Sequence, residues 1–215
     1  MNKALWILID AAILFAVSTL FVLLANLAFS GLKGKTPKDD PLVTAITQGN
    51  MTELTAAATA GGKVAALFDA QGRSALMRAA YVNLSDPTLI ATADAKRAAM
   101  IPLLLEHKAP LNQQDHDGWT ALMWAAWSGL PQTATQLLDK GALATPADRQ
   151  GHTALALAAR RGNVDIVRQL LARGADPAAT TLSGQSVLDL ARAGLREYPA
   201  KAPAYQEIIG LLGGK

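Results

Sequence analysis

The stretch D-H-D-G-W-T-A-L-M-W-A-A-W-S-G, residues 115–129, contains in order a tight turn, a helix start and a short apolar helix. The same pattern returns at residues 148–162 as D-R-Q-G-H-T-A-L-A-L-A-A-R-R-G. Looser copies occupy residues 69–81 and 183–193. The turn glycines at 118, 151 and 184 are 33 residues apart, and the glycine at 72 precedes the next by 46. A fixed period in this range predicts a stack of repeated helical units.

The residue types within each copy suit a helix hairpin. The glycine permits the positive φ that a tight turn often requires. Two positions later comes a hydroxyl that can accept hydrogen bonds from the first free N–H groups of a helix; these residues are Ser74, Thr120, Thr153 and Ser186. Small alanines follow and let neighbouring helices approach closely. A second helix is expected at 130–140 and at 163–173, each ending on a glycine cap.

Three segments resemble the ankyrin repeat: G-W-T-A-L-M-W-A-A-W-S-G (118–129), Q-L-L-D-K-G-A (136–142) and G-H-T-A-L-A-L-A-A-R-R-G-N-V-D-I-V-R-Q-L-L-A-R-G-A-D-P (151–177). The resemblance covers about residues 41–212. It implies an all-α ankyrin-repeat solenoid of about five helix-turn-helix repeats, at 41–68, 69–114, 115–147, 148–180 and 181–212. The first and last repeats match less well, as expected of units with one face in solvent.

Two kinds of departure from the ankyrin pattern stand out. The family usually has proline where this chain has Ala75, Ala121 and Ala154, and often histidine where it has Met77, Met123 and Ala156. We expect these changes to weaken the local capping networks without changing the fold.

The 46-residue step indicates an insertion in the second repeat. Aligning its Leu104-Leu105 pair with Leu170-Leu171 places the insertion at residues 82–94, between the two helices of that repeat. Pro87 predicts a loop there, and Pro102 is expected to kink the following helix or to shorten it from its start. We interpret the insertion as a tolerated surface loop rather than a partner contact.

The first 40 residues differ in composition from the array. Residues 4–29 form a largely apolar run in which Asp10 is the one charged residue. About 20 apolar residues cross a bilayer core, so a single transmembrane helix is predicted within an anchor spanning residues 1–30, followed by a linker at 31–40. A cleaved signal peptide is the alternative, but its apolar region is normally about 7–15 residues long.

This anchor predicts a single-pass protein of the cell (inner) membrane, of bacterial type. The side on which the array lies is nearly undecided. Lys33, Lys35 and Lys38 follow the apolar run, and this Lys/Arg count leans towards a cytoplasmic array. A short N-terminal tail bearing one lysine favours export instead, which makes a periplasmic array the alternative.

Several kinds of chemistry lack support in this sequence. There is no cysteine, so disulfides and thiol chemistry are excluded. None of His107, His116 and His152 has a second histidine at metal-ligand spacing. Residues 41–215 hold 16 basic and 14 acidic residues, which gives nucleic-acid binding no electrostatic basis. We therefore expect no enzyme activity, no cofactor, no metal site and no small-molecule substrate.

The ankyrin resemblance implies a protein partner, held by the finger tips and the concave side of the inner helices. Carried over by position, it predicts binding residues at the tips (His116, Asp117, Arg149), after the turn glycines (Trp119, His152) and on the inner helices (Arg78, Tyr81, Trp124, Trp127, Arg160, Arg161). Leu157 occupies the same repeat position as Arg78 and Trp124, and we expect all three to be exposed.

Three tryptophans in one repeat make residues 115–147 the best candidate for the binding centre. Trp124 and Trp127 are three residues apart and share a helix face. They are either exposed interface anchors or residues that pack against neighbouring repeats. Arg78, Tyr81 and Arg160 at the corresponding positions favour exposure, because charged residues are rarely buried.

The function predicted from these features is a non-catalytic, membrane-tethered protein-binding module. The alternative is an accessory or immunity-type protein that binds one specific enzyme or toxin and supports it or protects against it. The sequence does not choose between the two.

Overall fold

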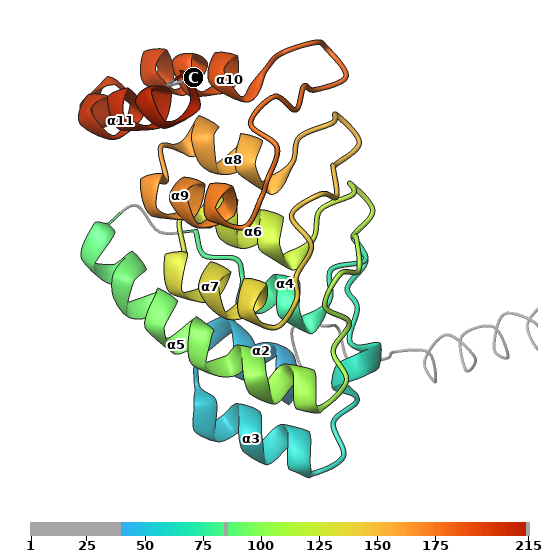
Figure 1. Ribbon diagram of the computed structural model, residues 1–215. Helices are drawn as coiled ribbons and strands as arrows, with labels where there is room; N and C mark the ends of the chain where they lie inside the picture. The colour runs from blue at the N-terminus through green and yellow to red at the C-terminus, as the bar shows by residue number, and fades with distance from the viewer. Residues whose placement is uncertain (1–39, 84–85, 214–215) are drawn as a thin grey trace, which may run out of the picture. The chain divides into compact units, whose positions relative to one another are not determined.

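In the computed structural model, the described residues 40–83 and 86–213 form a stack of five helix pairs (Figure 1). The first helix of each pair belongs to an inner row and the second to an outer row. The inner row is α2 (Pro41–Gln48), α4 (Ala75–Ala79), α6 (Ala121–Ser128), α8 (Ala154–Arg161) and α10 (Val187–Glu197). The outer row is α3 (Met51–Thr59), α5 (Pro87–Glu106), α7 (Pro131–Asp139), α9 (Val164–Ala172) and α11 (Ala202–Gly213). Of two short 3-10 helices, η2 (Val64–Ala66) lies between the first and second pairs, and η3 (Pro199–Lys201) lies within the fifth pair.

One hydrophobic core runs through the array, built from the same repeat positions in successive units. Leu76, Leu122 and Leu155 are each at most 1% exposed. Burying one leucine contributes roughly 1.5–3 kcal/mol, so the repeated leucine is a main source of stability. The paired alanines three and four residues after each of these leucines are also buried, and their small size lets the inner helices approach closely.

The helix ends confirm the boundaries expected from the repeat. The side chains of Ser74, Thr120 and Thr153 cap α4, α6 and α8, each accepting a hydrogen bond from the backbone N–H three residues on. Gly129 and Gly162 end α6 and α8 in the left-handed conformation, with φ of 71° and 72°. The predicted start and stop signals therefore act as expected.

Methionine fills the position where the capping network was expected to weaken. The backbone N–H of Ser74 donates to the Met77 sulfur at 3.3 Å, and that of Thr120 donates to the Met123 sulfur at 3.4 Å. Sulfur is a weak acceptor, so the second and third repeats keep the reciprocal contact in a weaker form.

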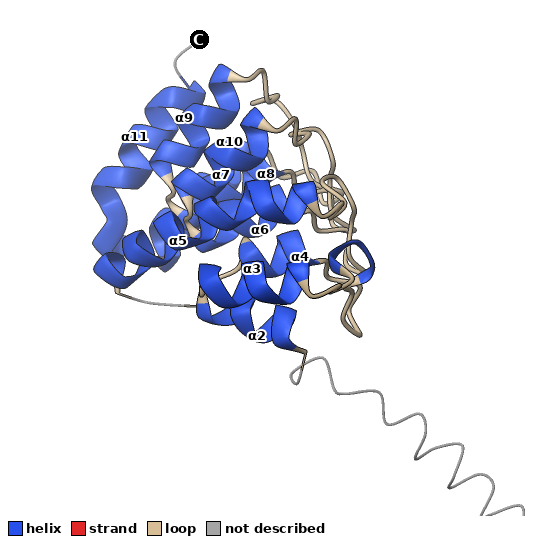
Figure 2. Ribbon diagram, turned by 90° about the horizontal axis from the view of Figure 1, so that it is seen from below, coloured by secondary structure: helices blue, strands red, loops and turns tan. Residues whose placement is uncertain are grey.

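The turns between repeats lie along one side of the helix stack, as Figure 2 shows. Backbone bonds join successive turns, for example Arg149 N–H to the Asp117 carbonyl at 3.1 Å. Gly118 has a φ of 87°, and a Cβ there would lie 3.0 Å from Asp148 Cα. Glycine is therefore needed both for the turn and for the close approach of the next one. In the described part of the chain these turns form isolated bridges rather than strands.

The insertion in the second repeat is helical over most of its length, so the loop prediction for it was wrong. Helix α5 begins at Pro87, and Asp86 caps it by accepting the Thr88 N–H at 2.8 Å. The helix continues through Pro102 to Glu106 and is not shortened at that proline. The physical reason is a start signal in the sequence: an Asp cap followed by proline in the first turn, where its missing N–H costs nothing.

Two buried polar side chains of α5 attach it to its neighbours. Asp94 is 1% exposed and accepts the backbone N–H groups of Gln132 and Thr133 at 2.7 and 2.8 Å, which caps α7 from outside. Arg97 is 7% exposed and donates to the carbonyls of Ile46 and Thr47 at the end of α2. An acid at a helix start and a base at a helix end both suit the helix dipole. Helix α5 thus joins the second repeat to the first through Arg97 and to the third through Asp94.

The predicted anchor at residues 1–30 and the predicted linker at 31–40, apart from Asp40, lie outside the described residues. Among those described, none of the helices has the length and apolarity needed to cross a bilayer.

Candidate functional site

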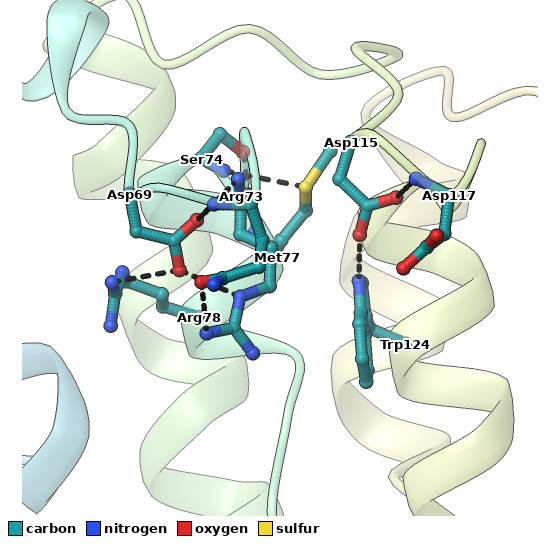
Figure 3. Close-up of polar contacts among 9 residues, drawn as sticks. Asp69, Arg73, Ser74, Met77, Arg78, Asp115, Asp117 and Trp124 are labelled. Atoms are coloured by element: carbon teal, nitrogen blue, oxygen red, sulfur yellow. Dashed lines mark hydrogen bonds and ion pairs between the residues drawn. The ribbon is translucent and has the colours of Figure 1, made fainter.

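Asp115 connects the turn of the third repeat to the helix behind it (Figure 3). Its Oδ1 accepts the backbone N–H groups of Asp117 and Trp119 at 3.0 and 2.8 Å. Its Oδ2 accepts the indole Nε1–H of Trp124 at 3.0 Å. The residue is only 8% exposed. Asp115, the first residue of the predicted turn, therefore also fixes the orientation of Trp124.

Asp69 plays the same part in the second repeat with different partners. Its Oδ1 accepts the backbone N–H groups of Gln71 and Arg73, and its Oδ2 accepts Arg73 Nε at 2.6 Å and an Arg78 guanidinium N–H at 2.9 Å. Burial by itself would raise the pKa of Asp69, but the hydrogen bonds and charge of Arg73 outweigh it and the pKa is lowered. Arg78, a predicted binding residue, is thus half-buried in an ion pair.

The fourth repeat completes the series. Asp148 Oδ1 accepts the backbone N–H of His152 at 2.8 Å, and its Oδ2 lies 3.1 Å from His152 Nδ1. At the position of Arg78 and Trp124 this repeat has Leu157, which is 2% exposed. The expectation that Leu157 is exposed was wrong, because an apolar side chain cannot donate to the turn carboxylate of Asp148 and packs into the core instead.

The aromatic rings of the second and third repeats form one continuous cluster. Trp119 lies between the other two tryptophans, with ring centroids 4.6 Å from Trp124 and 5.7 Å from Trp127. Tyr81 meets Trp124 edge-on at 5.1 Å. All four side chains are half-buried, and the tryptophans pack on the rim of the core. Each of the two interpretations of Trp124 and Trp127 therefore holds in part. The rings pack against their neighbours, and part of each ring remains accessible.

Arginines extend this cluster to both sides. The Arg161 guanidinium lies 4.5 Å from the Trp127 ring centroid and 5.2 Å from that of Tyr198. Arg73 lies 6.0 Å from the Trp124 ring. These are cation–π distances. We call the resulting set the aromatic–arginine surface; it consists of Arg73, Tyr81, Trp119, Trp124, Trp127, Arg161 and Tyr198, and it reaches from the second repeat to the fifth.

The remaining predicted binding residues lie beside this surface. Arg160 pairs with Glu197 at 3.6 Å and is accessible at its guanidinium. His116, Asp117 and Arg149 are exposed on the finger tips. The structure thus brings together the tryptophans, Tyr81 and Arg161, and keeps the tip residues on the neighbouring fingers.

Three residues near the surface were absent from the predicted set. Arg73 follows a turn glycine, as Trp119 and His152 do, so the repeat position alone identifies it. Tyr198 ends α10 and Lys201 lies in η3, where the chain has left the repeat register. No repeat copy points to these two, and only the folded arrangement reveals them.

A pocket of about 380 Å³ opens where the inner helices end. Tyr81, Trp127, Arg161, Asn163, Tyr198 and Lys201 are among its lining residues. It therefore adjoins the aromatic–arginine surface at its Arg161 end. Among residues 40–83 and 86–213, no three side chains of the kinds that ligate metals come together.

The family comparison agrees with the repeat seen in the structure. Residues 88–181 match the family model for ankyrin repeats (3 copies), a range that runs from α5 through α9. Ankyrin repeats are generally protein–protein interaction modules and typically lack catalysis. The comparison with curated proteins gave no match.

Proposed function

We propose that the array is a non-catalytic protein-binding module that the apolar segment 4–29 tethers to a membrane. The observation that supports binding is the aromatic–arginine surface, which links Tyr81 to Tyr198 by successive ring and cation–π contacts. Trp, Tyr and Arg dominate the energetically important positions of protein interfaces. Side chains already held by neighbours lose less entropy on binding, so this surface is prepared for a partner.

The membrane part of the proposal rests on composition. Residues 4–29 contain one charged residue, Asp10, in a run long enough to cross a bilayer. Tethering would concentrate the array at one membrane face, where a partner of the same membrane meets it at high effective concentration.

Site-directed photo-crosslinking tests the binding surface. A photoreactive residue in place of Arg149, on a finger tip beside the surface, is expected to crosslink one defined protein in cells. The matched control replaces Lys140, an exposed cation at the end of the outer helix α7. We expect Trp127→Ala to abolish the Arg149 crosslink while the melting temperature shows that the array is folded. The same products from both positions, or a crosslink that survives Trp127→Ala, would contradict the proposal.

Fractionation tests the tether. The full chain is expected in the alkali-washed membrane pellet, and a chain lacking residues 4–29 in the supernatant. A full chain that washes off would refute anchoring. C-terminal fusions to an export-dependent and to a cytoplasm-dependent reporter enzyme then decide on which side the array lies.

A further inference from the structure

The pocket at the ends of the inner helices is built around a fixed arginine. The Arg161 guanidinium lies between the rings of Trp127 and Tyr198, at 4.5 and 5.2 Å from their centroids. It also donates a hydrogen bond to Tyr198 Oη at 2.8 Å. A guanidinium has five N–H groups in a rigid fork that suits a carboxylate, and these contacts use one of them. Arg161 is therefore oriented in advance, with donors to spare.

The positive charge in this pocket is not neutralised by a carboxylate. Lys201 lies beside Arg161 and donates to its backbone carbonyl at 3.2 Å. Although the Lys201 side chain is largely exposed, the pKa of its ammonium is lowered, first by partial desolvation and second by the charge of Arg161. Among the described residues that line the pocket, none is acidic. By contrast, Arg160, Arg168 and Arg173 each pair with a carboxylate.

A structural role for these cations is the competing explanation. Arg161 is the last residue of α8, where a cation favours the helix dipole. However, its guanidinium extends to the rings of Trp127 in α6 and of Tyr198, which follows α10, rather than to the carbonyls of α8. Other groups bind those carbonyls: Tyr205 Oη donates to Arg160 O at 2.8 Å, and Lys201 Nζ donates to Arg161 O. The guanidinium of Arg161 is therefore available to bind a group outside the helix.

The charge pattern selects an acidic protein segment as the occupant. Two cations with no acid beside them attract a carboxylate, and Trp127 and Tyr81 offer apolar walls for the residues next to it. A polyphosphate chain needs cations along its whole length, and the array carries only a small excess of basic residues. A short acidic segment needs only the two cations of this pocket.

We propose that the pocket formed by Trp127, Arg161, Tyr198 and Lys201 receives a Glu or Asp side chain from an acidic segment of the partner protein. This assignment rests on the proposed protein-binding function and specifies the chemistry of its partner. Arg161 holds the carboxylate through its fork, and Lys201 adds charge at the rim.

Peptide titration of the purified full-length chain tests this assignment. The probe is the capped peptide Glu-Leu-Glu-Glu-Leu-Glu, and its control is the same peptide with Gln in place of Glu. We expect the Glu peptide alone to bind and to change tryptophan fluorescence, since Trp127 lines the pocket. Arg161→Gln is expected to weaken binding about tenfold or more, and Arg161→Lys to restore only part, because the charge remains and the fork is lost. Lys140→Gln, the same charge change on an outer helix, is expected to leave the affinity unchanged.

The possible outcomes separate this assignment from the function on which it rests. Absence of Glu-peptide binding at millimolar concentration, or equal weakening by Lys140→Gln, overturns it. Equal Arg161-dependent affinity for inorganic phosphate or for single-stranded DNA also overturns it, in favour of a small anion or a nucleic acid. A partner crosslink at Arg149 that persists unchanged in Arg161→Gln rejects the acidic segment and leaves protein binding intact. Glu-peptide binding without any crosslinked partner rejects the wider function instead.

Discussion

The turns of the second and third repeats share a backbone and differ in what their aspartate holds (Figure 3). In both, Oδ1 accepts two backbone N–H groups of the turn. Oδ2 of Asp69 binds two arginines, whereas Oδ2 of Asp115 binds the indole of Trp124. The position nine residues after the aspartate therefore decides whether the carboxylate holds a further cation, as at Arg78, or a half-buried ring, as at Trp124.

This difference shows how a repeat protein changes its surface without changing its fold. The carboxylate is required by the turn, so any donor at the ninth position gains a fixed, partly buried acceptor. Arginine satisfies it with charge, and tryptophan satisfies it with a neutral N–H while adding a large aromatic area. Leucine, in the fourth repeat, takes no part and is buried. The four predictions below test how far this comparison holds, from the largest expected effect to the smallest.

Removing each aspartate is expected to give the largest losses of stability. Asp69→Ala removes the acceptor of two backbone N–H groups and leaves Arg78 half-buried without its partner. We expect it to lower the free energy of unfolding by about 3 kcal/mol, against about 2 kcal/mol for Asp115→Ala, which leaves a neutral indole unpaired. Urea denaturation of both variants measures the two costs.

Asp117→Ala is the matched control, because this aspartate lies in the same turn and is exposed. Its cost is expected to stay within about 0.5 kcal/mol. A cost for Asp115→Ala that equals or exceeds that for Asp69→Ala would show that the arginine pair adds nothing beyond the turn.

Substitution at Trp124 tests the ninth position directly. Trp124→Phe keeps a ring but leaves Asp115 Oδ2 buried without its donor, and we expect a loss of about 1–2 kcal/mol. Trp124→Arg recreates the Asp69–Arg78 contact of the second repeat, without the Arg73 contact, and is expected to lose less, because its guanidinium again satisfies the carboxylate. Thermal melting of the two variants side by side decides the order. The reverse order would mean that ring packing, rather than the bond to Asp115, holds this helix face.

Acidification distinguishes the ion pair of Asp69 from its turn bonds. The pKa of Asp69 is lowered in the folded chain, so its charge stabilises the fold above the unfolded value of 3.8 and this contribution is lost as pH falls through the folded pKa. Asp69→Asn keeps the Oδ1 acceptor and removes the charge. At neutral pH we expect it to be less stable by about 1 kcal/mol, and we expect this gap to close below pH 3.8.

Denaturation curves at neutral and acid pH measure that gap, with Asp117→Asn as a control of the same charge change at an exposed position. A gap that stays constant, or widens on acidification, would exclude the charge of Asp69 as its origin.

The sequence predicted the parts of this molecule that repeat. Turn glycines, hydroxyl caps and buried leucines recur at a fixed step, so each copy supports the others and the helix boundaries follow. It failed at residues 82–94, where no second copy exists, and Pro87 was interpreted as a loop signal although Asp86 makes it a helix start.

The candidate site shows the same division between features that repeat and features that do not. The repeat aligned Arg78 with Trp124 and Asp69 with Asp115, but it did not show that the carboxylates hold these side chains, because a turn aspartate looks the same in sequence whether or not its second oxygen is used. The roles of Tyr198 and Lys201 follow only from the folded structure, in which the ends of the inner helices of four repeats line one pocket.

Replacing the capping methionine is expected to give the smallest effect. Met77→Leu preserves volume in a fully buried site and removes only the sulfur that accepts the Ser74 N–H at 3.3 Å. We expect a cost of about 0.5 kcal/mol, and the same for Met123→Leu, because sulfur is a weak acceptor and such swaps are well tolerated. The fourth repeat supports this size, since Ala156 at the same position has no acceptor and α8 is still capped by Thr153. Urea denaturation provides the free energies, and hydrogen exchange at the Ser74 amide shows whether that bond is the one lost. A cost above about 1.5 kcal/mol at Met77 alone would mean that the turn of Asp69 depends on this cap more than the turn of Asp115 does. The two repeats would then differ in how their helices are capped as well as in their surfaces.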